Sequence, residues 1–185
     1  MKLHLEPGRP ADYDSRIPQE REAYDFLDQL GIPYDRVDHE AVFTIDACAE
    51  VDRLLGTSLC KNLFLCNRQK TEYYLLMLPG SKKFVTKELS RQLGTARLSF
   101  ADETALQELL GLTPGSVTVL GLMHDPSQRV QLLIDSELLH APYICCHPCI
   151  NTSSLRIATK DILDRFLPAV SHTPRFVELS NGETV

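Results

Sequence analysis

The chain has 185 residues and a formal net charge of −6, a length that one domain can accommodate and that allows a sizeable core. Hydrophobic residues make up 43% and charged residues 24%, the ordinary balance of a globular protein. The acidic balance argues against a non-specific nucleic-acid binder. No apolar run is long enough to span a membrane and no secretory signal is visible, so we expect a cytoplasmic protein.

The N-terminal part predicts an arm followed by alternating helices and strands. Residues 1–17 are polar and proline-bearing, which predicts a loose arm. Pro18 stands where a helix tolerates proline, and apolar residues then recur at helical spacing until Gly31. A strand at 34–38 and a helix at about 46–55 follow. The folded domain is expected to span residues 18–178, and residues 179–185 are expected to form a tail.

Residues 59–67 are nearly apolar on both alternating faces, which is typical of a strand covered on both sides. A hairpin should join them to residues 73–78. Alternation puts Lys61 on the face of Leu63 and Leu65. A lysine is rarely buried without a partner. Lys61 therefore either extends to solvent at the strand end or faces a cleft and meets an anion.

The second half predicts further short elements. Ser99 and Asp102 fit a capping box at the start of a helix that ends at Leu110. Helices are expected at 86–93 and 159–167, a helical turn at 136–140, and strands at 98, 116–122, 130–134, 143–145, 155–158 and 176–177. About seven strands interleave with five helices without strict alternation. This favours a single α/β domain whose mixed sheet is curled toward a barrel, with helices outside.

Residues 145–154 combine three thiols, an imidazole, a carboxamide and three hydroxyls. Three interpretations stay open: a polar turn, a zinc site, or a cleft in which His147 and Asn151 offer hydrogen bonds. Cys146 and Cys149 form one zinc knuckle, but no second knuckle exists, so we expect no metal. A nucleophilic pair of Cys149 and His147 is conceivable, although no orienting acid is evident.

The segment from Lys61 to Arg97 is basic. It has eight Lys or Arg and two Glu residues, and thus carries 8 − 2 = +6. Such a surface on an acidic protein suits a limited contact with phosphates, and the alternative is a solvated helix face.

Five short pieces, in this order, resemble the YbaK/prolyl-tRNA editing family, and most of all its free-standing branch, which edits alanine mischarged on proline tRNA. The pieces are Val42-Phe43-Thr44, Lys61-Asn62-Leu63-Phe64-Leu65, Leu78-Pro79-Gly80, Pro114-Gly115-Ser116-Val117-Thr118 and His147-Pro148-Cys149-Ile150-Asn151-Thr152. The sequence departs from the family at Val119 and at Glu40-Ala41, where prolines are common.

The resemblance implies one mixed α/β domain that hydrolyses the ester between an amino acid and the tRNA 3′ end, without metal or cofactor. It places catalysis on Lys61 and His147. The residues implied in substrate binding are Phe43, Thr44, Asn62, Gly115, Ser116 and Asn151.

Trans-editing of alanyl-tRNA(Pro) is therefore the expected function. The acceptor end of the tRNA should contact Lys82, Lys83 and Lys87, and prolyl-tRNA synthetase is a candidate partner. Two alternatives stay open: a Cys-tRNA(Pro) deacylase of the same family, and a catalytically silent tRNA-binding module.

Overall fold

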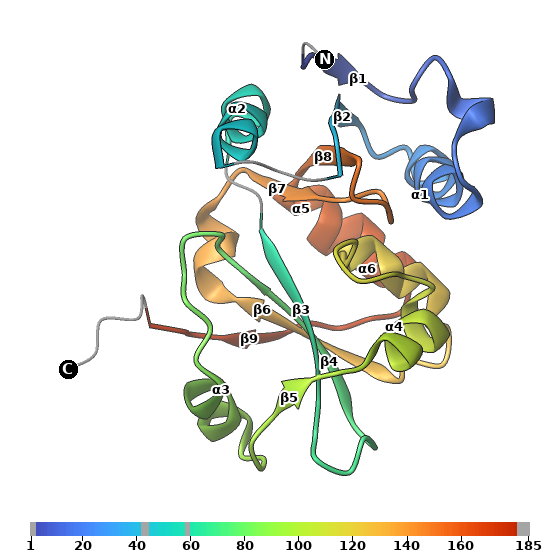
Figure 1. The fold of residues 1–185 in the computed structure, drawn as a ribbon. Coiled ribbons are helices and arrows are strands. Elements are labelled where there is room, and N and C mark those ends of the chain that lie inside the picture. The colour runs from blue at the N-terminus through green and yellow to red at the C-terminus, as the bar shows by residue number, and fades with distance from the viewer. Residues whose placement is uncertain (1–2, 42–44, 58–59, 181–185) are drawn as a thin grey trace.

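The computed structural model describes residues 3–41, 45–57 and 60–180, and its strands form two sheets (Figure 1). The first sheet has the order β1-β2-β8-β7, with every pair antiparallel. Its strands are β1 (Leu5–Pro7), β2 (Tyr34–Asp38), β7 (Tyr143–Cys146) and β8 (Ser153–Ala158).

The second sheet has the order β5-β3-β4-β6-β9. The expected hairpin of β3 and β4 is antiparallel and pairs Lys61 with Leu78, whereas β6 joins β4 and β9 in parallel. Its strands are β3 (Lys61–Cys66), β4 (Tyr73–Leu78), β5 (Ser99–Phe100), β6 (Val130–Asp135) and β9 (Arg175–Val177).

The helices surround these sheets (Figure 1). The α-helices are α1 (Pro18–Gln29), α2 (Ile45–Leu55), α3 (Thr86–Leu93), α4 (Glu103–Leu110), α5 (Thr159–Asp161) and α6 (Leu167–Ala169). Short 3₁₀ segments are η1 (Tyr13–Ser15), η2 (Val119–His124) and η3 (Ser136–His140), and η4 (Ile162–Phe166) is a π-helical turn between α5 and α6.

Two hydrophobic clusters lie on opposite faces of the second sheet. Phe64 and Leu75 belong to the main core, which also includes Ile157 of the first sheet. Leu65 belongs to a second cluster, which Leu89 of α3 covers. The sheet is therefore buried on both faces, which confirms the expectation drawn from the apolar run in β3.

The α/β class is confirmed, but a single curled sheet of about seven strands is wrong, because the described residues form nine strands in two sheets and no closed barrel. After β6, in the second sheet, the chain passes through η3 and enters the first sheet, where β7 pairs with β8. The loose arm is also wrong in part, since β1 pairs with β2.

Two local expectations fail as well. Residues 119–124 form η2 instead of a strand, because the Thr118 hydroxyl caps the amide of Leu120. A side chain at Gly121 would collide with Leu112, so a glycine allows this close packing. The cap of α4 is Asp102, whose carboxylate accepts from the Ala105 amide, whereas Ser99 lies in β5.

Candidate functional site

Three distant segments of the chain enclose a small cavity of about 220 Å³. They are the start of β3, the turn before η2 and the loop between β7 and β8. We call it the His147 cavity, and the described residues that line it are Cys60, Asn62, Gly115, Val117, Cys146 and His147. The structure thus brings together three of the expected catalytic and substrate-binding residues: Asn62, Gly115 and His147.

His147 follows directly after β7, and its ring is held in one tautomer. Its Nδ1 lies 2.7 Å from the carbonyl oxygen of Ser153, and a carbonyl only accepts, so Nδ1 carries the proton. Burial lowers the pKa of His147, although this hydrogen bond acts in the opposite direction. A neutral imidazole therefore leaves Nε2 unprotonated and without a hydrogen bond to a described residue, in a side chain that lines the cavity.

His39, which follows directly after β2, supports this arrangement. The sequence alone did not identify His39 as a site residue. Its Nε2 lies 2.8 Å from the Ser154 hydroxyl, and that hydroxyl is 3.5 Å from Nδ1 of His147. The two imidazole rings meet edge to face, with centroids 6.1 Å apart. Burial also lowers the pKa of His39. His39 and Ser154 are 115 residues apart, so no local pattern could have paired them.

Asn62 contributes an acceptor that the fold leaves unsatisfied. Its Nδ2 donates to the Cys60 carbonyl at 3.3 Å, whereas its Oδ1 is buried and has no hydrogen-bond partner among the described residues. Buried polar atoms nearly always have partners. An unsatisfied acceptor at the wall of a cavity is therefore ready for a donor on a bound molecule.

The turn at Gly115 and Ser116 is built for close approach. Gly115 has φ +86°, and a side chain there would meet Nδ2 of Asn151 at 3.3 Å, so Asn151 lies against this turn. Ser116 is buried, and both its hydroxyl and its amide donate to the Thr113 carbonyl. Ser116 therefore shapes the turn through its hydroxyl and its amide, and its expected part in substrate binding stays a prediction. The amides of Gly115 and Val117 have no partner within the described part of the chain.

The thiols at the cavity are poor nucleophiles. Burial raises the pKa of Cys60 to about 11 and that of Cys146 to about 12. Burial likewise raises the pKa of Cys149, which is only 5% exposed. The thiolate is the reactive form, so a nucleophilic pair of Cys149 and His147 is disfavoured. In the residues that the structure describes, no group of three His, Cys, Asp or Glu side chains converges as a metal site.

Lys61 shares a face with Leu63 and Leu65, as alternation predicted, but this is not the face of the cavity. Asn62 lines the cavity, and Lys61 points to the other side of β3, where its Nζ donates to the Lys82 carbonyl at 2.6 Å. The side chain is exposed. Lys61 is thus not among the described residues that line the cavity, and its catalytic role stays a prediction.

Lys82 is not a surface cation, which corrects its expected contact with tRNA. It is 5% exposed, and its Nζ lies 2.9 Å from Oδ1 of Asp135 and 2.9 Å from Oε2 of Glu137. A third hydrogen bond, of 2.7 Å, goes to the carbonyl of Leu179. Lys82 thus joins its turn to β6 and to the C-terminal segment. Lys83 and Lys87 are exposed.

Phe43 and Thr44, expected to wall the amino-acid pocket, lie outside the described residues. Within those residues, no helix combines the length and the apolar character needed to cross a membrane.

Comparison with known proteins agrees with these features. The family of aminoacyl-tRNA editing domains matches residues 39–165. The prolyl-tRNA editing protein ProX of Acetoanaerobium sticklandii is 31% identical over 153 residues, which cover 83% of this chain and 93% of ProX. The prolyl-tRNA synthetase associated domain-containing protein 1 of Danio rerio is 35% identical over 156 residues, covering 83% of this chain and 84% of that protein.

The fold is also found in solved structures. A candidate trans-editing enzyme for prolyl-tRNA synthetase superimposes with a TM-score of 0.64 at 18% identity, covering 90% of this chain and 100% of that one. The fold expected from the resemblance is thereby confirmed. The chain belongs to the aminoacyl-tRNA editing domain family and is an editing hydrolase.

Proposed function

We propose that this protein hydrolyses the ester bond of mischarged tRNA(Pro), and that its preferred substrate is alanyl-tRNA(Pro). One observation carries the proposal: in a chain of this family, Asn62, Gly115 and His147 line one cavity. Because an aminoacyl ester is already activated, such a site has mainly to position water and to stabilise an oxyanion.

His147 orients and deprotonates the attacking water in this proposal. The neutral imidazole accepts a proton at Nε2, because Nδ1 donates to the Ser153 carbonyl. Water oxygen then bonds to the ester carbon, and the carbonyl electron pair moves to oxygen. When the intermediate collapses, the C–O bond to the ribose breaks, and the ribose oxygen takes the proton that His147 held.

The amides of Gly115 and Val117 are the donors that we assign to the oxyanion. Both residues line the cavity, and neither amide is used within the described fold. The amide of Ser116 is unsuited to this role, because it already donates to Thr113. Oδ1 of Asn62, an unsatisfied acceptor, fits the α-ammonium group of the amino acid.

Lys61 acts outside the cavity in this scheme. Lys61 lies in the sequence between two residues that line the cavity, Cys60 and Asn62, but its ammonium group is on the opposite side of the strand. We therefore assign it to a phosphate near the tRNA 3′ end and not to the ester carbonyl.

The size of the cavity favours a small amino acid. Pockets for whole small-molecule ligands usually measure about 300–1,000 Å³, and this one measures about 220 Å³. Sterics reject larger side chains well, but a single methylene is discriminated weakly. Alanine should be removed rapidly, cysteine more slowly, and proline hardly at all.

The test is competition among alanyl-, cysteinyl- and prolyl-tRNA(Pro), with release of the free amino acid measured in each case. We expect kcat/KM for alanine to exceed that for proline by at least about 100-fold, because the proline ring and secondary amine do not fit. Faster release of cysteine would assign the protein to cysteine editing. Binding of all three without any release would contradict the proposal and leave a silent tRNA-binding module.

A further inference from the structure

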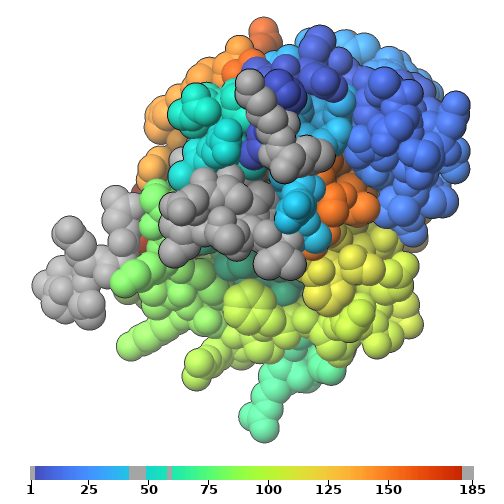
Figure 2. All heavy atoms as spheres, turned by 45° about the horizontal axis from the view of Figure 1, so that its top comes forward, coloured from blue at the N-terminus to red at the C-terminus, as the bar shows by residue number. Residues whose placement is uncertain are grey.

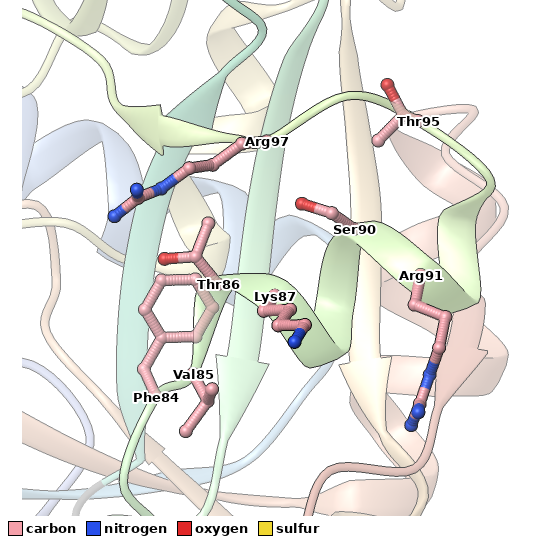
Figure 3. A pocket seen from close by; sticks show the side chains of 8 residues that line it. All are labelled: Phe84, Val85, Thr86, Lys87, Ser90, Arg91, Thr95 and Arg97. Atoms are coloured by element: carbon pink, nitrogen blue, oxygen red, sulfur yellow. The ribbon is translucent and has the colours of Figure 1, made fainter.

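A second pocket lies beside α3, and the hydrolysis proposed above does not use it. Its volume is about 680 Å³, and Figure 3 shows the side chains around it. Three of them are cationic and three carry hydroxyl groups. We call it the basic pocket, and it is lined by Phe84, Val85, Thr86, Lys87, Ser90, Arg91, Thr95 and Arg97.

The cations of this pocket are available to a ligand. Lys87, Arg91 and Arg97 are exposed, and none of them makes an ion pair with another described residue. Lys87 and Arg91 are four residues apart on α3 and so lie on one side of the helix. Arg97 comes from the segment between α3 and β5 (Figure 3). Side chains of this green segment project from the surface in Figure 2.

The surrounding charge is positive on a protein that is acidic as a whole. Residues 83–97 contain four basic residues and one acidic residue, Glu88, which gives 4 − 1 = +3 against −6 for the chain. The Glu88 carboxylate accepts hydrogen bonds from the amide and the hydroxyl of Ser180, at 2.9 and 3.0 Å. It is therefore committed to the C-terminal segment. This uneven distribution of charge attracts a polyanion to residues 83–97 and away from the acidic remainder of the surface.

Aromatic rings accompany these cations. Phe84 lines the pocket, and Phe100 packs against it edge to face, with ring centroids 6.1 Å apart. Phe100 is 64% exposed, a high fraction for so large an apolar side chain. Cations that follow a backbone, together with an exposed ring on which a base can stack, are typical of sites for single-stranded nucleic acid.

One hydrogen bond links the strand that borders the His147 cavity to the segment where the basic pocket begins. Lys61 lies between the cavity residues Cys60 and Asn62, and its ammonium group bonds to the carbonyl of Lys82. Lys82 is two residues before Phe84, where the basic pocket begins. A single strand that passes from the cavity around the start of β3 to the ammonium group of Lys61 would therefore come close to the basic pocket.

We propose that the basic pocket binds single-stranded RNA, with phosphates held by Lys87, Arg91 and Arg97 and a base stacked on Phe100. This inference rests on the proposed function only in naming the RNA, which is the unpaired 3′ end of the aminoacyl-tRNA. The binding itself is independent of hydrolysis.

The experiment measures binding of a single-stranded RNA of about ten nucleotides, and of the same sequence in a duplex, as a function of salt. In the double variant Lys87→Ala/Arg97→Ala, affinity for the single strand should fall about tenfold, and the salt slope should flatten by about 1.4, or 0.7 for each lost phosphate contact. The matched control is Arg129→Ala/Lys160→Ala, which removes two exposed cations elsewhere and should change neither.

Phe100→Ala should weaken single-strand binding about tenfold without changing the salt slope, since a stacked ring carries no charge. Its control is Phe176→Ala, at a second exposed phenylalanine. The proposal would be overturned if the double variant bound single-stranded RNA with the affinity and the salt slope of the wild type. It would also be overturned if the protein preferred the duplex and Phe100→Ala had no effect on binding. If the wild-type protein hydrolyses no aminoacyl ester but binds single-stranded RNA, and the double variant loses this binding, the proposed function is refuted. The inference about the basic pocket then still holds.

Discussion

The His147 cavity and the basic pocket differ in size, in exposure and in charge. The cavity measures about 220 Å³, and the described residues that line it are neutral, including Asn62 with its buried acceptor and a half-buried His147 whose pKa burial lowers. The basic pocket measures about 680 Å³ and presents three exposed cations. One site is small and neutral, and the other is larger and charged.

This difference separates chemistry from attachment. Inside a small, partly buried site, a hydrogen bond is stronger than in water, and a misplaced group raises the barrier to reaction. Solvated cations act through long-range attraction that salt screens. We therefore expect substitutions in the cavity to change kcat and substitutions in the basic pocket to change affinity and its salt dependence.

The largest expected effect is that of His147→Ala. Removing a general base typically lowers the rate by about 10²–10⁴-fold, and kcat/KM for alanyl-tRNA(Pro) should fall by that amount. Binding of uncharged tRNA should stay as in the wild type, because the basic pocket is intact. His140→Ala removes an exposed histidine of η3 and is the control. Equal losses of rate and of tRNA affinity would break the division between the two sites.

Lys82→Ala tests where the basic pocket ends, because Lys82 is close to the pocket in sequence but is buried. Burial alone would lower the pKa of Lys82, but the hydrogen bonds and charges of Glu137 and Asp135 raise it. Removing one partner of a buried pair costs about 3–5 kcal/mol. The free energy of unfolding, measured in urea, should fall by that amount.

The control for this variant is Lys83→Ala, at an exposed neighbour, which should change stability by less than about 0.5 kcal/mol. A stable Lys82→Ala protein with a flattened salt slope for RNA would mean that Lys82 is a phosphate contact after all.

The sequence could predict local structure and motifs well, since both depend on neighbouring residues. Alternation placed Lys61 correctly with Leu63 and Leu65, but it could not tell which face of β3 borders a cavity. That depends on Gly115 and His147, which come from other parts of the chain.

Long-range pairs explain the remaining errors. The partners of Lys82 are 53 and 97 residues away, at Asp135 and Leu179. A sequence window therefore shows Lys82 only as one more cation in a basic segment. The spacing of Lys87 and Arg91 was a usable signal, because residues four apart share a helix face.

The smallest expected effect concerns pH and again separates the two sites. Burial lowers the pKa of His147 and of His39, so both are neutral in the folded protein at pH values where a free histidine, with a pKa near 6.5, begins to take up a proton. The unfolded chain then binds more protons than the folded one. Stability should accordingly be fully present above about pH 6.5 and should decline as the pH falls through the folded-state values.

The same direction applies to catalysis, because only neutral His147 can accept a proton from water. After subtraction of spontaneous ester hydrolysis, kcat/KM should stay level from pH 8 to about 6.5 and decrease only below that value. RNA binding should show no such step, since the lysine and arginine side chains of the basic pocket do not titrate in this range. His39→Asn should reduce the loss of stability at acid pH, because one of the two titrating groups is gone. A decline in kcat/KM that begins above pH 6.5 would show that His147 is more easily protonated than its burial implies, and the assignment of this side chain as the base would fail.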